Sequence, residues 1–171
     1  MSADNARRGM VDYLEPEFLH ALGIAVATFA LVETLLKNAF FHTRHGHMDF
    51  EMSPLTVLEI SDCNFAVRID KLFKELRGKV EDFAKKGLDL LQEDFHKIRV
   101  VRNLVVHGMW KKTNKAGFYK CSSMDEKGRS ISQPVSKEML LGAASTADNL
   151  MVELKSLLVA EGLYPPIGPR I

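Results

Sequence analysis

A long apolar segment near the N-terminus constrains the fold of this chain more than any other feature. From Pro16 to about Thr43, apolar residues recur every three or four positions, as they do along one face of an α-helix. Further apolar residues, Ile24, Leu31 and Leu35, fall between them, so the predicted helix is apolar on nearly every side. Such a helix lies at the centre of a core or is covered by a partner subunit.

The same segment does not fit a membrane span or an export signal. Its apolar run, Phe18–Val32, is shorter than the roughly 20 residues that cross a bilayer, and Glu33 ends it. Acidic residues at 12, 15 and 17 separate the run from Arg7 and Arg8, and no small-residue cleavage pattern follows it. We therefore predict a cytoplasmic protein without a membrane segment.

The rest of the pattern predicts a mainly α protein with one small β element. Helices are expected at about 54–61, from 64 to about 86 with a defect at Gly78, from 88 to 107, and from 136 to about 161. Aromatic, serine and turn residues between 109 and 135 predict two or three short strands in a hairpin. The predicted architecture is a single up-and-down helical bundle over residues 16–161, with the hairpin inserted before the last helix. Residues 1–15 are expected to form an arm and 162–171 an extended tail.

Positive charge is concentrated in one window of the chain. The net charge of the whole chain is only +1, but residues 95–124 contain no Asp or Glu and seven Lys or Arg. A concentrated basic segment on an otherwise acidic protein predicts a surface that binds a polyanion such as nucleic acid. An ordinary solvated surface is the alternative.

The stretch "VRNLVVHGMW" (101–110) places polar groups in an apolar helix inside that window. On a helix over 88–107, Arg99, Asn103 and His107 form one row of i, i+4 neighbours, with Arg102 beside it. Arginine binds phosphate oxygens through its planar guanidinium, and histidine can take a proton from a ribose 2′-hydroxyl near neutral pH. These residues predict a phosphodiester-cleaving site that needs no metal, because the guanidinium can stabilise the developing charge. A helix end with ion-paired arginines is the plainer interpretation.

Arg102-Asn103, followed by three residues and His107, resembles the signature of the HEPN superfamily (higher eukaryotes and prokaryotes nucleotide-binding). The resemblance implies a homodimer with two facing motif helices and no cofactor. Arg102 would stabilise the phosphorane, His107 would act as the base and Asn103 would orient the reacting groups. Many members are metal-independent endoribonucleases of toxin–antitoxin or phage-defence systems, which implies RNA as substrate and an antitoxin as partner. Other members bind nucleotides or proteins without cleavage, so a non-catalytic binding module is the alternative.

Basic and aromatic residues around the motif are candidate RNA contacts. Arg99, Lys111 and Lys112 are the predicted RNA-binding residues outside the catalytic trio. The aromatic residues at 110, 118 and 119 interleave with lysines and could stack bases, although packing of these rings on the helical bundle is the favoured interpretation.

Three other features contain residues that could take part in chemistry. Glu33 lies in the most apolar helix and needs a partner; it is expected either to tune the motif or to make an ordinary hydrogen bond. The histidines of "HTRHGH" (42–47) could ligate a metal, but a solvated helix end is favoured, and no metal is predicted. Cys63 and Cys121 match no metal-ligand spacing and are predicted to be reduced thiols.

Overall fold

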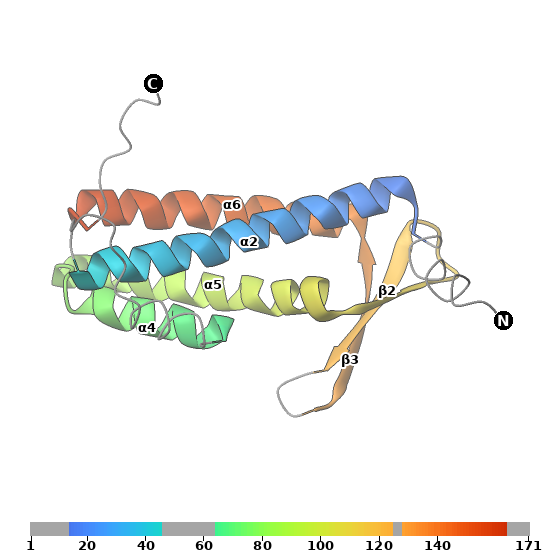
Figure 1. Cartoon of the computed structure of the whole chain (residues 1–171), viewed down its shortest axis with the longest axis horizontal. Coiled ribbons are helices and arrows are strands. Elements are labelled where there is room, and N and C mark those ends of the chain that lie inside the picture. The colour runs from blue at the N-terminus through green and yellow to red at the C-terminus, as the bar shows by residue number, and fades with distance from the viewer. Residues whose placement is uncertain (1–13, 46–63, 125–127, 164–171) are drawn as a thin grey trace, which may run out of the picture. The chain divides into compact units, whose positions relative to one another are not determined.

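The structure is a computed structural model of the whole chain, and it describes residues 14–45, 64–124 and 128–163 (Figure 1). Across these residues it has four helices and one three-stranded antiparallel sheet. The helices are α2 (Pro16–His45), α4 (Phe65–Arg77), α5 (Asp82–His107) and α6 (Lys137–Ala160). The strands are β1 (Met109–Lys112), β2 (Phe118–Met124) and β3 (Ser130–Ser136), in the sheet order β1-β2-β3. The predicted mainly α class, with a small β element before the last helix, is confirmed, while the helix predicted at 54–61 lies outside the described residues.

The chain forms two compact units, each built from segments that are far apart in sequence. Of the described residues, the sheet unit contains 14–29, 100–124 and 128–146. The helical unit contains 30–45, 64–99 and 147–163. Helices α2, α5 and α6 contribute residues to both units, so the end of α5 belongs to the sheet unit and its start to the helical unit.

In the helical unit, α4 begins where the sequence predicts but ends sooner. Asn64 caps its first turn with a side-chain hydrogen bond. The helix was expected to reach residue 86 with a defect at Gly78, but it ends directly before that glycine. The backbone N–H groups of Lys79 and Val80 donate to the carbonyl of Leu76, and Val80 is buried in the resulting turn. Gly78 is therefore a helix end, and the predicted continuation is wrong.

Helix α5 starts earlier than predicted and runs through Gly87, which was expected to separate two helices. It begins at Asp82, whose carboxylate accepts a hydrogen bond of 2.6 Å from Lys85 Nζ. A negative charge in the first turn is favourable to a helix. The charge of Asp82 and the complete burial of Leu88 together offset the cost of about 1 kcal/mol that Gly87 brings to the helix interior.

The core of the helical unit is made from the apolar faces of its helices. Helix α4 lies along α5 (Figure 1), and the rings of Phe73 and Phe95 are 5.8 Å apart between them. At the rim of this contact Arg77 donates to Asp89 Oδ1 at 2.7 Å. The largest fully buried side chains of this unit are Leu36, Ile69, Leu72, Phe73, Leu76, Leu88, Phe95, Leu154 and Leu158.

In the sheet unit, β2 is the central strand and the two faces of the sheet differ. Tyr119 and Cys121 of β2 are buried, as is Val135, which lies opposite Tyr119 in β3. These residues define the inner face. Lys111 and Lys120, which are Cα partners between β1 and β2, are exposed and belong to the outer face.

Phe18 of α2 packs on the inner face of the sheet. Its ring centroid lies 5.3 Å from that of Trp110 and 4.1 Å from that of Tyr119. The Tyr119 hydroxyl accepts a hydrogen bond of 2.9 Å from the backbone N–H of Glu15. The prediction that aromatic rings of this segment pack on helices is thus confirmed for Trp110 and Tyr119, whereas Phe118 lies on the outer face.

Among the described residues, α2 alone is long and apolar enough to cross a membrane. The share of its most apolar segment that is buried is 33%. Leu35 is buried, whereas Ile24 and Leu31 are exposed by 38% and 60%. Core helices and N-terminal leader segments share this length and composition, so the cytoplasmic location stays a prediction.

Candidate functional site

The predicted catalytic residues lie at the end of α5, where the helix meets the sheet. The helix ends at His107, and Gly108 carries the chain into β1. A Cβ atom at Gly108 would lie 2.2 Å from both Cys121 Sγ and the carbonyl oxygen of Leu104. The Cys121 thiol also donates to that carbonyl at 3.2 Å. Only glycine fits this junction, which fixes the helix end against the sheet.

Arg102 joins Asn103 and His107 into one group, called here the motif cluster. The guanidinium nitrogen Nη1 donates to Asn103 Oδ1 at 3.0 Å and lies 2.9 Å from His107 Nε2. Because a guanidinium has donors only, this hydrogen bond requires Nε2 as the acceptor and the ring hydrogen on Nδ1. The structure therefore brings together the three residues that the sequence predicted to act together.

The motif cluster is accessible from solvent. His107 is exposed, while Arg102 and Asn103 are half-buried. Val100 and Val106, on the same stretch of α5, are exposed by 59% and 39%. An imidazole sealed in the core could not reach a substrate, whereas the exposed imidazole of His107 can.

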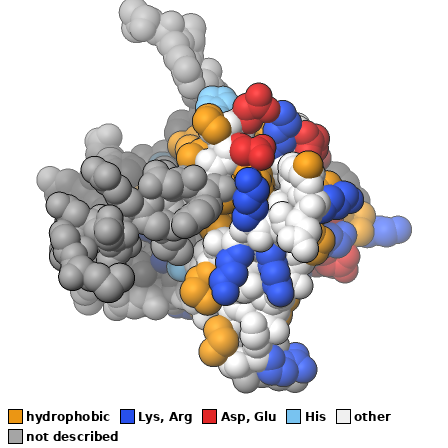
Figure 2. Space-filling view, turned by 90° about the vertical axis from the view of Figure 1, so that its right-hand side faces the viewer, with side chains coloured by type: hydrophobic (Ala, Val, Ile, Leu, Met, Phe, Trp, Pro, Cys, Tyr) orange, Lys and Arg blue, Asp and Glu red, His pale blue; other side chains and the backbone are white. Residues whose placement is uncertain are grey.

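The predicted RNA contacts are divided between different surfaces. Arg99 is half-buried in the part of α5 that belongs to the helical unit. Lys111 and Lys112 are exposed neighbours in β1 and therefore point to opposite faces, Lys111 beside Lys120 and Lys112 opposite Tyr119. Figure 2 shows Lys and Arg side chains gathered over part of the face that it presents. Lys120 was missing from the predicted site because its place opposite Lys111 depends on strand register.

Glu33 forms an ion pair in the helical unit. Its Oε2 accepts a hydrogen bond of 3.1 Å from Arg68 Nη1, and both side chains are largely buried. This contact satisfies the need of a carboxylate in an apolar helix for a partner. The predicted tuning of the motif by Glu33 stays a prediction.

The histidines at the end of α2 lie against an aromatic ring. The rings of His42 and His45 have centroids 5.7 Å and 5.1 Å from that of Phe41, and His47 lies outside the described residues. Within 14–45, 64–124 and 128–163, no group of three His, Cys, Asp or Glu side chains is placed to hold a metal ion.

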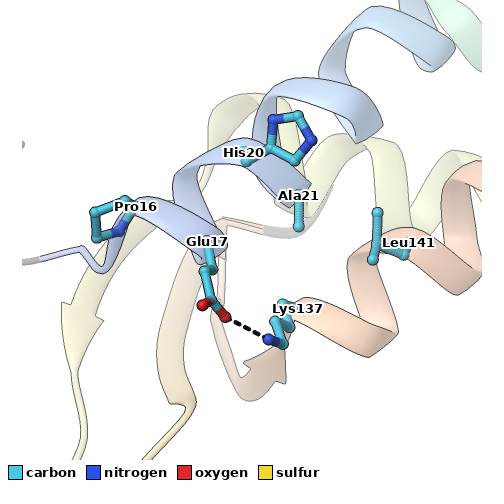
Figure 3. A pocket seen from close by; sticks show the side chains of 6 residues that line it. All are labelled: Pro16, Glu17, His20, Ala21, Lys137 and Leu141. Atoms are coloured by element: carbon cyan, nitrogen blue, oxygen red, sulfur yellow. Dashed lines mark hydrogen bonds and ion pairs between the residues drawn. The ribbon is translucent and has the colours of Figure 1, made fainter.

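A shallow pocket of about 410 Å³ lies between the starts of α2 and α6 (Figure 3). At its edge Glu17 and Lys137 point toward one another, and Lys137 Nζ donates to Glu17 Oε2 at 2.5 Å. This hydrogen bond and the opposite charges lower the pKa of Glu17 and raise the pKa of Lys137. The pocket is lined by Pro16, Glu17, His20, Ala21, Lys137 and Leu141, so it contains no residue of the motif cluster.

Comparisons with known proteins leave the chain without an assigned family. No protein-family model matches the chain, no curated protein matches its sequence, and no solved structure matches its fold. The resemblance to the HEPN superfamily therefore stays a prediction from the motif at 102–107.

Proposed function

We propose that this protein is a HEPN-like endoribonuclease that cleaves RNA without a metal ion, with the motif cluster as its active site. The observation that carries the proposal is the contact of 2.9 Å between Arg102 Nη1 and His107 Nε2 at an exposed helix end. It supports the proposal because an imidazole that accepts this hydrogen bond is neutral, which is the form that a general base needs.

The proposed reaction begins when the scissile phosphate replaces His107 as the acceptor for the guanidinium of Arg102. Nε2 of His107 then accepts the proton of the ribose 2′-hydroxyl, and the 2′-oxygen attacks the phosphorus. Arg102 stabilises the charge on the phosphorane, and Asn103 holds the guanidinium through Oδ1. The bond to the 5′-oxygen breaks, and this oxygen receives the proton from the imidazolium. The products are a 2′,3′-cyclic phosphate and a 5′-hydroxyl.

We further propose that a second copy of the chain covers the surface around the motif cluster. Val100 and Val106 are exposed there, and exposed apolar side chains beside a functional site are typical of an interface. Val152 and Val159 on α6 are exposed to a similar extent, by 57% and 37%, and serve as controls outside the motif cluster. Sedimentation should show a dimer that Val106→Glu dissociates and Val159→Glu leaves intact; a monomeric wild type would refute the dimer.

A non-catalytic RNA- or nucleotide-binding module is the second candidate. It is favoured by the position of the motif cluster on an exposed surface rather than in the pocket of Figure 3. Such a module keeps its affinity for RNA in His107→Ala and produces no cyclic-phosphate ends.

A cleavage assay on mixed cellular RNA with EDTA present distinguishes the two functions. We expect wild-type cleavage to survive EDTA and to fall at least about 100-fold in Arg102→Ala and His107→Ala. His20→Ala, which changes an exposed histidine of the same unit outside the motif cluster, is the control and should cleave normally. Cleavage that persists in His107→Ala would refute the proposed active site, and a folded wild type that binds RNA without cutting it would favour the binding module.

The biological setting follows from the same proposal. We place the protein among the ribonucleases of toxin–antitoxin or phage-defence systems, with a neutralising protein as its partner. Induced expression should then arrest growth, and Arg102→Ala should relieve the arrest at equal protein level. Growth arrest that is identical in this variant would contradict the assignment.

A further inference from the structure

The outer face of the sheet holds two lysines directly opposite each other. Lys111 of β1 and Lys120 of β2 are Cα partners, and both side chains are exposed. Neither forms an ion pair with any residue in the described part of the chain. Like charges placed opposite each other destabilise an antiparallel pair of strands. An anionic ligand bound between the two ammonium groups would remove this repulsion.

The groups around this pair suit a nucleic acid strand. Register places Ser122 and Ser132 on the same face, with their hydroxyl oxygens 3.0 Å apart. Phe118 also lies on this face, and Lys115 Nζ is 3.9 Å from the centroid of its ring. Cations, hydroxyl groups and an aromatic ring on one open surface are the elements with which proteins bind single strands.

We propose that the outer face of the sheet binds single-stranded RNA, with Lys111 and Lys120 contacting phosphates of the same strand that reaches the motif cluster. This inference rests on the proposed function, because it assigns the surface that holds the substrate. Only three residues separate His107 from Lys111 in the chain, so the backbone path between them is at most about 14 Å. A single strand is favoured over a duplex because unpaired bases can stack on an aromatic ring, whereas the bases of A-form RNA are already stacked in the helix.

Lys112 provides a matched control for this proposal, because the proposed surface excludes it although the sequence predicts it as an RNA contact beside Lys111. It follows Lys111 in the same strand and is also exposed, but it lies opposite Tyr119 on the other side of the sheet. The probe is a fluorescent single strand of about 12 nucleotides with 2′-O-methyl groups, which lacks the attacking hydroxyl and stays intact. Its affinity is measured over a range of salt concentrations, because each phosphate contact on a single strand adds about 0.7 to the salt slope.

We expect Lys111→Ala with Lys120→Ala to reduce the salt slope by about 1.4, and Lys112→Ala to leave it unchanged. Lys111→Glu separates binding from folding, because it turns the repulsive pair into an attractive one. In this variant the affinity for RNA should fall, while the midpoint of thermal unfolding stays at or above that of the wild type.

Three outcomes would overturn the proposal. The first is an unchanged salt slope in the double variant, and the second is an equal decrease of the salt slope in Lys112→Ala. The third is that the wild type binds polyglutamate as tightly as RNA, which would assign the face to an acidic protein. The binding measurement does not require cleavage. A protein that binds here without cleaving refutes only the proposed reaction, and one that cleaves with an unchanged slope refutes only the proposed surface.

Discussion

One nitrogen of Arg102 serves two acceptors in the motif cluster: Nη1 lies 2.9 Å from His107 Nε2 and 3.0 Å from Asn103 Oδ1. Both hydrogens of this nitrogen are needed for the two contacts. A planar group with several fixed donors can hold such an arrangement, whereas a single ammonium on a flexible stem loses more freedom in doing so.

Arg102→Lys therefore tests whether the site needs geometry or only positive charge. We expect the single-turnover rate of RNA cleavage to fall at least about 100-fold, because the ammonium cannot reproduce the guanidinium fork. The affinity for uncleavable RNA should fall less than in Arg102→Ala, since the charge is kept. Cleavage at the wild-type rate would show that charge alone suffices.

The tautomer of His107 is a second test of the same contact. Donation from Arg102 requires an unprotonated Nε2, so the hydrogen of the neutral ring must be on Nδ1. We expect ¹⁵N chemical shifts near neutral pH to report the Nδ1–H tautomer in the wild type, and this preference to be lost in Arg102→Ala. A dominant Nε2–H tautomer in the wild type would contradict the geometry.

Helical spacing identified the residues of the site but not the contacts between them. The i, i+4 rule placed Arg99, Asn103 and His107 in one row, whereas Arg102 is the residue whose contacts join Asn103 and His107. Spacing gives the direction of each Cβ atom. The position of a guanidinium depends on the rotatable bonds beyond it, and these depend on tertiary surroundings.

Helix ends and strand register show the same limit. Gly78 and Gly87 both looked like interruptions, but only Gly78 ends a helix, because an interior glycine costs a helix too little to end it by itself. The strands between 109 and 135 were predictable from composition. The pairing of Lys111 with Lys120 was not, since it depends on where the turn between β1 and β2 closes.

Gly108→Ala should damage both the fold and the site. The new methyl group would meet Cys121 Sγ and the carbonyl oxygen of Leu104 at 2.2 Å, so the helix end and the sheet would have to separate. We expect the free energy of unfolding in urea to decrease by about 2 kcal/mol, the usual range for overpacking, and cleavage to decrease with it. Unchanged stability would show that the junction is looser than described.

Gly87→Ala is the matched change with the opposite expected sign. This glycine lies inside α5, and nothing is within 4 Å of the added Cβ atom. Alanine loses less backbone entropy than glycine when it enters a helix, so the free energy of unfolding should increase by about 0.5–1 kcal/mol. The same urea titration measures it, and a decrease would mean that the helix is broken at this position as the sequence first indicated.

The thiol of Cys121 should make stability depend on pH in alkaline solution. Burial raises the pKa of this thiol from its ordinary value of 9.0 to about 11. Between these values the unfolded chain has released a proton that the folded chain keeps, so the free energy of unfolding falls as pH rises. The stabilising contribution is complete below about pH 9 and is lost as pH approaches 11.

Cys121→Ser isolates this contribution, because its hydroxyl can still donate to the carbonyl of Leu104 but does not titrate in this range. Urea unfolding is measured from about pH 8 to 11 in a Cys63→Ser background, which removes the other thiol. Lysine and tyrosine groups titrate alike in both proteins, so the difference between the two curves reports Cys121 alone. We expect the serine variant to lose less stability over this range. Parallel curves would mean that the thiol ionises as readily in the folded chain as in the unfolded one, which would contradict its burial between the sheet and the end of α5.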